Sequence, residues 1–316
     1  MKKHISISVI IPTYKPDDIF LELLEKLSKQ SKVIEKIVII NTISGEFPES
    51  QVKSYENVEV HHINEADFNH GASRNLGVSF CDTDIIAFMT QDAKPRDNKL
   101  IENLIKSLAD DINKQSECVA ASYARQLPTS DCNFIESYTR SFNYGEVSMI
   151  KTRADLKEMG IKTFFCSNVC AAYRRDIWIK RGGFVNRTIF NEDMIYAGLL
   201  IKDNYKIAYE ANAVVIHSHN YTNIQQFKRN FDLAVSQTEY PEVFLDISSE
   251  GEGIKLVKRT IMYLLNEKKA YLIPMLIITS TFKYIGYFLG KRYKKLPLSV
   301  ILACTMSKKY WKNGKN

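Results

Sequence analysis

The segment SISVIIPTYKPDDIFLELLEKLSKQSKVIEKIVIINT, residues 6–42, contains the pattern that decides the fold. Two apolar runs rich in Ile and Val, at 6–14 and 34–42, each end in polar residues and therefore indicate buried strands. Between them, apolar residues recur at helical spacing after Asp17, which we expect to cap the helix. A strand, a helix and a second strand in this order predict two parallel strands joined by a crossover helix.

The same alternation continues along the chain and predicts an α/β fold with a mostly parallel sheet flanked by helices. We expect strands at 58–64, 84–95, 118–128 and 206–222, a strand followed by a helix at 164–184, and helices at 72–81, 98–112, 191–205 and 223–240. Gly182 and Gly183 are expected to close the helix within 164–184. Residues 133–161 predict a partly helical excursion that lines a substrate cleft.

The nucleotide-binding motifs of two large enzyme classes are missing from the sequence. No G-x-G-x-x-G follows the first strand, which argues against a dinucleotide-dependent dehydrogenase, and no G-x-x-x-x-G-K-[ST] occurs, which argues against a P-loop NTPase.

Polar segments follow four of the expected strands, at 12–15, 41–44, 64–70 and 90–94. The carboxyl ends of parallel strands meet at one edge of a sheet, where ligands bind in such folds. The stretch EADFNHGASRN, residues 65–75, is dense in hydrogen-bonding groups and leads into a helix, whose N-terminus favours anions. Its glycine allows a close approach of backbone.

Three groups of residues have the chemistry of a catalytic site. Asp92 follows a buried strand and fits either a metal ligand or a turn cap. Glu192 and Asp193 open a helix, where their side chains point about 100° apart and need not share a role; complementing the helix dipole is the simpler alternative. His217 and His219 alternate at the end of a strand and so face one side, as metal or phosphate ligands or as core histidines.

Charge is distributed unevenly along the chain. Residues 253–316 contain 14 Lys and Arg against the single acid Glu267, a balance of +13 within a total of +7, so the preceding 252 residues carry −6. A basic, aromatic tail predicts contact with something anionic. We expect two domains, 1–240 and a helical region at 241–316.

The tail allows several structures. The apolar run 271–282 is interrupted by Pro274 and followed by Lys283, so it falls short of the ~20 uncharged residues of a spanning helix. A packed helical hairpin, a pair of interfacial helices on anionic lipid, and a subunit interface in a homo-oligomer stay open. We expect the N-terminal run to be a buried strand rather than a secretory signal, and the six cysteines to be reduced core thiols of a cytosolic protein. Cys166 and Cys170 have helical rather than zinc-binding spacing.

Six motifs occur together in order: VIIPTYKP, FNHGASRN, MTQDAKP, FFCSNVCAAYRR, GGF followed by NEDM, and VIHSHNY. With these motifs the chain resembles a family 2 glycosyltransferase of the GT-A fold, a Rossmann-like mostly parallel sheet, within the rhamnosyltransferase-like branch. The resemblance runs from Ser6 to about Tyr240.

The resemblance implies a set of donor-binding residues around the strand ends. They are Pro12, Thr13, Tyr14, Asn41 and Thr42 for the nucleotide, Asp67 for a base contact, His70 and Arg74 for the sugar or its phosphates, and Gln91 and Asp92 at the position of the D-x-D motif. Many members have an acid where this chain has Asn41. Because only Asp92 of the D-x-D acids is present, His217 or His219 would complete the shell of a divalent metal, Mn²⁺ or Mg²⁺.

The resemblance also implies the reaction. Asp193 is the general base, with Glu192 as its neighbour, in an inverting transfer of L-rhamnose from dTDP-β-L-rhamnose to a lipid-linked saccharide acceptor during cell-surface polysaccharide synthesis. Metal and Arg74 stabilise the departing diphosphate. A UDP-hexose donor and a catalytically idle, nucleotide-binding scaffold are the alternatives. We expect the protein to be peripheral at the inner face of the cell membrane, with no nucleic-acid partner.

Overall fold

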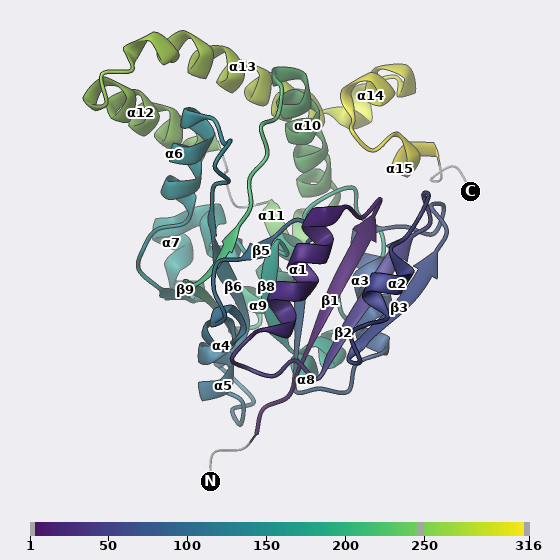
Figure 1. Ribbon diagram of the computed structural model, residues 1–316. Helices are drawn as coiled ribbons and strands as arrows, with labels where there is room; N and C mark the ends of the chain where they lie inside the picture. The colour runs from purple at the N-terminus through teal and green to yellow at the C-terminus, as the bar shows by residue number, and fades with distance from the viewer. Residues whose placement is uncertain (1–3, 246–249, 313–316) are drawn as a thin grey trace. The chain divides into compact units, whose positions relative to one another are not determined.

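A computed structural model describes residues 4–245 and 250–312 and places one mixed sheet at the centre of the larger part of the chain (Figure 1). The sheet has nine strands in the order β3-β2-β1-β4-β8-β6-β9-β5, with β7 pairing β9. Six strands run in one direction, and β5, β7 and β8 oppose them, which confirms the predicted mostly parallel sheet. The strands are β1 (Ile7–Tyr14), β2 (Lys36–Thr42), β3 (Val58–Ile63), β4 (Ile85–Met89), β5 (Lys94–Pro95), β6 (Val119–Leu127), β7 (Met149–Lys151), β8 (Cys170–Arg174) and β9 (Lys206–Ile216).

The register of β1 brings the expected ligand-binding ends together. Thr13 lies beside Asn41, and Tyr14 beside Thr42, in the parallel β1–β2 pair. Asn41 in turn lies beside His62 of β3. The carboxyl ends of these three strands therefore form a continuous polar edge.

Alternate residues of the central strands bury against helices on opposite faces of the sheet. On one face, Ile7, Val9 and Ile11 belong to a core cluster that includes Phe20 and Leu24 of helix α1 (Asp18–Ser28). The Asp17 side chain accepts hydrogen bonds from the backbone N–H groups of residues 19 and 20, as predicted for a cap. Because successive side chains of a strand point to opposite faces of the sheet, one strand packs against the helices of both layers.

The other face is packed with aromatic side chains. The ring of Phe88 in β4 lies 5.3 Å from those of Trp178 and Phe184 and 5.6 Å from that of Tyr173. Helix α8 (Arg175–Arg181), which carries Trp178, ends at Gly182 in the left-handed conformation with a φ of 79°, as the glycine pair predicted.

Two predicted elements are broken in the structure. The expected helix 98–112 is divided into α4 (Leu100–Leu104) and α5 (Lys106–Asp110). Ser122 donates to the Leu104 carbonyl at 2.6 Å, and the Ser107 N–H donates to Glu210 at 3.2 Å, so groups distant in sequence replace helical hydrogen bonds. The expected strand 84–95 ends at Met89, because a turn closed by the hydrogen bond from Ala93 to Thr90 separates it from β5.

The remaining helices complete the two layers and the C-terminal region. They are α2 (Glu49–Val52), α3 (His70–Ser79), α6 (Phe134–Asn143), α7 (Leu156–Met159), α9 (Glu192–Lys202), α10 (Asn223–Glu239), α11 (Pro241–Phe244), α12 (Glu250–Asn266), α13 (Ile273–Gly290), α14 (Leu298–Cys304) and α15 (Lys308–Lys312), with short 3-10 helices at Arg153–Asp155, Gly160–Phe164, Ala270–Leu272 and Tyr293–Lys295. The excursion at 133–161 is partly helical, as expected.

The chain divides into two compact units. One unit comprises residues 1–130, 144–187 and 192–218 and contains the sheet; the other comprises residues 131–143, 188–191 and 219–316 and is helical. The predicted domain division into 1–240 and 241–316 stays a prediction.

Within the helical unit, α13 crosses α10 at close range. A Cβ on Gly286 would lie 2.1 Å from the Phe227 carbonyl oxygen, and one on Gly290 would lie 2.3 Å from that of Phe231. The glycine pair therefore lets the two helix backbones approach each other.

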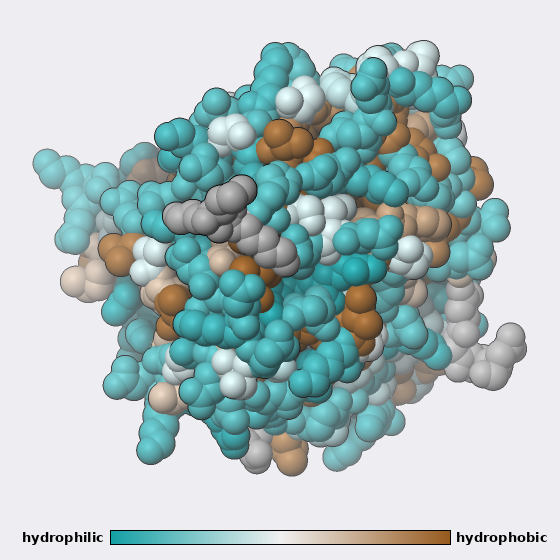
Figure 2. All heavy atoms as spheres, turned by 90° about the horizontal axis from the view of Figure 1, so that it is seen from below, coloured by the Kyte–Doolittle hydropathy of each residue, from teal (hydrophilic) through white to brown (hydrophobic). Residues whose placement is uncertain are grey.

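The helical segment Ala270–Gly290 carries exposed apolar residues beside the glycine face. Tyr271 in the 3-10 helix Ala270–Leu272 and Met275, Ile278, Phe282 and Ile285 in α13 recur at helical spacing and are 36–73% exposed. The helical segment Ala270–Gly290 is long and apolar enough to cross a membrane by length and composition, which by itself is weak evidence for a span. The face seen in Figure 2, by contrast, is mostly hydrophilic, with hydrophobic residues in small separate groups.

Candidate functional site

The ends of β1, β2 and β3 are joined by a chain of polar side chains. Thr13 donates its hydroxyl to the Asn41 Oδ1 at 2.9 Å, and the Asn41 amide nitrogen lies 3.0 Å from the Nδ1 of His62. The Nε2 of His62 lies 3.0 Å from Glu49. Thr13 and Asn41 are buried and engaged with each other, and their contact with the donor nucleotide stays a prediction. Thr42, next to Asn41, is buried with a hydroxyl that has no hydrogen-bond partner among the described residues.

Tyr14 and Gln91 bring the first and fourth strand ends together. The Tyr14 N–H donates to the Gln91 side-chain oxygen at 2.8 Å, and the Gln91 amide donates to the Tyr14 carbonyl at 3.1 Å. The Tyr14 hydroxyl donates to Glu65 at 3.3 Å, while its ring is 46% exposed. Pro12, half-buried, precedes this pair in β1 beside Ile40. Donor contacts of Pro12, Tyr14 and Gln91 stay predictions.

The stretch at 65–75 has a structural role that the sequence did not reveal. Asn69 caps α3, and Asn75 both donates to the Phe184 carbonyl at 2.8 Å and accepts from the Phe184 N–H at 3.0 Å. A Cβ on Gly71 would lie 2.0 Å from the Val185 carbonyl oxygen, so the backbone that approaches this glycine belongs to the protein itself. Much of the polarity of this stretch therefore holds α3 against residues 184–186.

Asp67 and His70 lie on the exposed side of the same stretch. Asp67 accepts a hydrogen bond from Asn64 at 3.1 Å, and the ring of His70 lies edge-on to Phe68 at 5.1 Å. Both side chains remain accessible to a ligand at the strand edge.

Arg74 is buried and paired with one of the two acids. Its Nη1 lies 3.1 Å from the Glu192 Oε1 and donates to the His70 carbonyl at 2.9 Å. The predicted contact of Arg74 with the donor phosphates stays a prediction, since the described contacts of its guanidinium are with the protein.

One residue, Asn168 in the loop before β8, donates hydrogen bonds to both Asp193 and Glu192. The Asn168 N–H donates to the Asp193 Oδ2 at 3.0 Å, and its side-chain amide donates to the Glu192 Oε1 at 3.2 Å. The other oxygen of Asp193 accepts from the Met194 N–H at 2.7 Å. Glu192 is buried, whereas Asp193 is half-buried and so retains access to a substrate.

The electrostatic environment separates the two acids. Burial raises the pKa of the Asp193 carboxyl, and the negative charge of Glu192 raises it further, to about 7. Burial alone would also raise the pKa of Glu192, but the Arg74 guanidinium and the Asn168 amide hold it below its ordinary value. Glu192 therefore stays ionised, and Asp193 has the pKa near neutrality that suits a general base.

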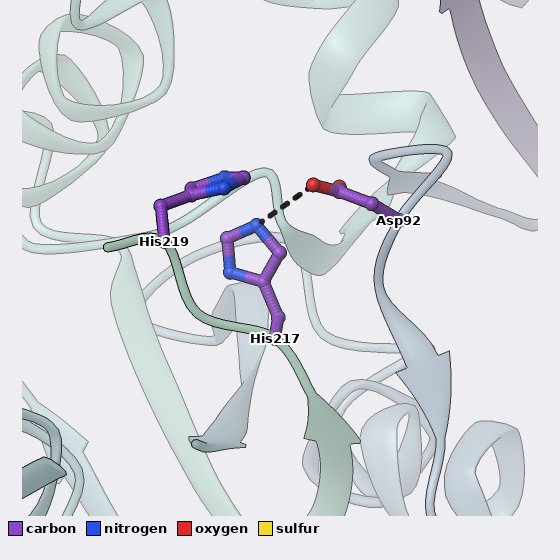
Figure 3. Close-up of side chains that lie close together, drawn as sticks. All are labelled: Asp92, His217 and His219. Carbon is purple, nitrogen blue, oxygen red and sulfur yellow. Dashed lines mark ion pairs between the residues drawn. The ribbon is translucent and has the colours of Figure 1, made fainter. Parts of the chain in front are cut away.

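Asp92, His217 and His219 come together at the sheet edge (Figure 3). One ligand atom from each lies within 4.8 Å of the others, and the His217 Nε2 is 3.5 Å from the Asp92 Oδ2. Strand β9 ends at Ile216, so the two histidines lie just beyond the strand end rather than alternating on the strand. The turn after β4 supplies Asp92.

The cluster fits a divalent metal. Ligands ~2.1 Å from one ion lie at most about 4.2 Å apart, so a small movement of these side chains suffices. Gln126 donates to the Ser167 hydroxyl at 3.1 Å, which turns its oxygen toward the His217 Nδ1 at 3.3 Å. If Nδ1 carries the proton, the Nε2 lone pair faces the Asp92 carboxylate, and a cation between them relieves the repulsion.

Three residues that support the site were not predicted: Gln126, Ser167 and Asn168. Ser167 and Asn168 lie inside the motif FFCSNVCAAYRR, so the motif pointed to the right segment without giving their partners. Gln126 at the end of β6 has no local signal.

Comparisons with known proteins identify relatives of the chain. The family model described as glycosyl transferase family 2 matches residues 8–182. The O-antigen chain rhamnosyltransferase RfbN of Salmonella typhimurium is 38% identical over 309 residues, covering 97% of this chain and 96% of its own length. The O-antigen chain rhamnosyltransferase WbaN of Salmonella anatum is 38% identical over 311 residues, covering 98% and 96%.

Solved structures share the fold. A mannosyltransferase, PcManGT from Pyrobaculum calidifontis in complex with GDP-Man and Mn²⁺, aligns with a TM-score of 0.56 at 14% identity and covers 98% of this chain and 88% of its own. S. aureus TarS 1–349 in complex with UDP-GlcNAc aligns with a TM-score of 0.54 at 13% identity, covering 92% and 91%. The GT-A fold, the family match and the near-complete relatives lead to one conclusion: the chain belongs to glycosyl transferase family 2.

Proposed function

We propose that the protein is an inverting rhamnosyltransferase that transfers L-rhamnose from dTDP-β-L-rhamnose to a lipid-linked saccharide acceptor in the synthesis of a cell-surface polysaccharide such as O-antigen. The observation that carries the sugar is the 38% identity to two O-antigen chain rhamnosyltransferases over nearly the whole chain. The reaction type rests on the half-buried Asp193, whose carboxyl has a pKa of about 7.

In this mechanism Asp193 accepts the proton of an acceptor hydroxyl as that oxygen forms a bond to the anomeric carbon. The bond from that carbon to the diphosphate breaks on the opposite face, and its electron pair leaves with the diphosphate oxygen. A correctly placed base of this kind contributes roughly two to four orders of magnitude in rate. Each oxygen of Asp193 already accepts one backbone N–H, which fixes the carboxylate while leaving lone pairs for the hydroxyl.

A divalent metal held by Asp92, His217 and His219 would neutralise the negative charge of the departing diphosphate. Thr13, Asn41 and Thr42 would hold the nucleotide, with Pro12, Tyr14 and Gln91 beside them. Asp67 and His70 are exposed and would contact the base and the sugar or phosphates.

The acceptor proposal draws on the helical unit. The stripe Tyr271, Met275, Ile278, Phe282 and Ile285 on the segment Ala270–Gly290 is apolar and exposed, and the segment 253–316 carries a charge of +13. An amphipathic, basic surface of this kind lies in the interface of an anionic membrane, with the protein on its cytosolic side, where lipid-linked acceptors are found.

Donor binding tests the substrate. We expect calorimetry to give tighter binding of dTDP-L-rhamnose than of UDP-glucose, UDP-galactose or UDP-GlcNAc, and tighter binding with Mn²⁺ than without. The variant Asp193→Asn should bind the donor normally and lose turnover. Tighter binding of a UDP-sugar would show that the donor is not dTDP-L-rhamnose and would leave the mechanism unchanged. Unchanged turnover in Asp193→Asn would show that Asp193 is not the base.

Flotation with vesicles containing anionic phospholipid tests the membrane surface. The double variant Ile278→Asp, Ile285→Asp should lose most of its vesicle recovery. The matched control is Ile179→Asp on α8, a residue that is 57% exposed outside the helical unit. Equal vesicle recovery of the wild type, the double variant and Ile179→Asp would contradict the proposal.

A further inference from the structure

Asn168 makes three hydrogen bonds within the acid pair and its surroundings. Its N–H donates to Asp193, its amide donates to Glu192, and its side-chain oxygen accepts from the Tyr173 hydroxyl at 2.9 Å. The residue is 3% exposed. It therefore contacts both acids and the aromatic core beneath them.

The hydrogen bonds around Asn168 have a fixed direction. Tyr173 is fully buried, and burial raises the pKa of its hydroxyl well above the ordinary value, so it stays a neutral donor. Its oxygen lies 3.5 Å from the Cys166 sulfur, and burial raises the pKa of that thiol to about 12, so the thiol also keeps its proton. The Tyr173 donor holds the carboxamide oxygen on its side and thereby turns the NH₂ toward Glu192.

The loop that carries Asn168 is itself anchored. Lys151 of β7 is 1% exposed and donates to the Lys162 carbonyl at 3.2 Å and to the Phe165 carbonyl. Its Nζ lies 4.7 Å from the centre of the Tyr123 ring. The backbone just before Asn168 is thus tied to the buried Lys151 side chain of β7, which limits the movement of the Asn168 N–H.

From these contacts we propose that Asn168 is a positioning residue for the transfer reaction: it holds the Asp193 carboxylate in the orientation that accepts the proton, and through Glu192 and Tyr173 it locks that orientation to the core. This inference rests on the proposed role of Asp193 as the base. Asn168 does not need to touch the substrate to exert this effect, because its N–H contacts the reacting carboxylate directly.

Loss of the Asn168 side chain should change the pH dependence of turnover. The Asn168 N–H lowers the pKa of Asp193 against the effect of burial. Removal of the side chain, which fixes the loop, weakens this hydrogen bond. The acidic limb of the kcat profile should then move to higher pH, while binding of the donor stays the same.

The test compares Asn168→Ala with Tyr173→Phe and with the control Asn103→Ala, whose side chain donates only to the Asn212 carbonyl at 3.0 Å among its described contacts. We expect Asn168→Ala to lower kcat at least tenfold, to change the donor KM less than twofold, and to move the acidic limb up by about half a pH unit or more. Tyr173→Phe should also lower kcat and move the acidic limb to higher pH, by less than Asn168→Ala does. Asn103→Ala should leave kcat and the acidic limb unchanged.

A purely structural role would lower the melting temperature of Asn168→Ala and leave the acidic limb in place, which overturns the proposal. If Asn168→Ala does not fold, Tyr173→Phe decides: a wild-type kcat and limb would overturn it. Asp193→Asn is measured alongside. If Asp193→Asn retains turnover, Asp193 is not the base and the proposed function is rejected. If Asp193→Asn loses turnover but the acidic limb is unshifted in Asn168→Ala and Tyr173→Phe, only the role of Asn168 is rejected.

Discussion

Arg74 and Glu192 form a buried ion pair, with Nη1 3.1 Å from Oε1 and side chains only 6% and 8% exposed. The pair links α3 to the start of α9. It also leaves Asp193 as the acid without a cationic partner of this kind, which is why the two neighbouring acids differ in pKa.

We expect Arg74→Met to lower the free energy of unfolding by about 3–5 kcal/mol, because removing one partner leaves a buried charge uncompensated. Urea unfolding monitored by circular dichroism measures this change. Arg96→Met is the control, since Arg96 pairs with Asp97 at 3.3 Å where both side chains are more than 40% exposed, and such pairs contribute about 1 kcal/mol or less. Similar losses in the two variants would contradict the burial argument.

The stability of Asp193→Asn relative to the wild type should depend on pH. The folded-state pKa of Asp193 is about 7, above the unfolded value of about 4, so its stabilising contribution is present below pH 4 and is lost as the pH rises through 7. The variant should therefore gain stability relative to the wild type between pH 4 and 8, on top of a constant offset from one altered hydrogen bond. Thermal melts of the variant and the wild type across this pH range measure the difference in stability. A difference that does not change with pH would mean that the pKa of Asp193 is not shifted by folding.

Gln126→Leu should weaken Mn²⁺ binding about 10–100-fold, because groups that orient a metal-binding histidine have effects of this size. Calorimetric titration of Mn²⁺ measures the affinity without any turnover. His217→Ala should weaken binding at least as much, and His61→Ala, whose ring stacks on Phe80 at 3.5 Å, should leave it unchanged. Wild-type Mn²⁺ affinity in Gln126→Leu would show that the histidine needs no such support.

Gly286→Ala should destabilise the helical unit by about 1–3 kcal/mol, since the new Cβ would lie 2.1 Å from the Phe227 carbonyl oxygen and force α10 and α13 apart. Gly253→Ala in α12 is the matched control, because its Cβ would meet nothing within 4 Å and alanine favours a helix by up to about 1 kcal/mol. Urea unfolding of the two variants should thus give changes of opposite sign.

The layered fold was predictable because burial on both faces of a sheet leaves a local signature. Ile and Val runs marked β1 and β2, and helical spacing after Asp17 marked α1. The insertion of β8 antiparallel between β4 and β6 has no such signature, since the pattern at 170–174 is the same in either direction.

The site was predictable to the level of its reactive groups and no further. Strand ends and motifs pointed to Asp92, Asp193 and the two histidines. The division of labour between the acids depends on Arg74, which lies more than a hundred positions earlier and was assigned to the donor. Contacts between distant segments, such as that of Gln126 with Ser167, arise only when the sheet is assembled.

Ser167 and Asn168 are consecutive, yet in the proposed mechanism one orients the metal-binding histidine through Gln126 and the other orients the base. A displacement of this dipeptide would disturb departure of the nucleotide and deprotonation of the acceptor at the same time. Efforts to retarget the enzyme to another sugar should therefore vary the residues at the ends of β1, β2 and β3, and should transplant the loop before β8 only together with β6 and the start of α9.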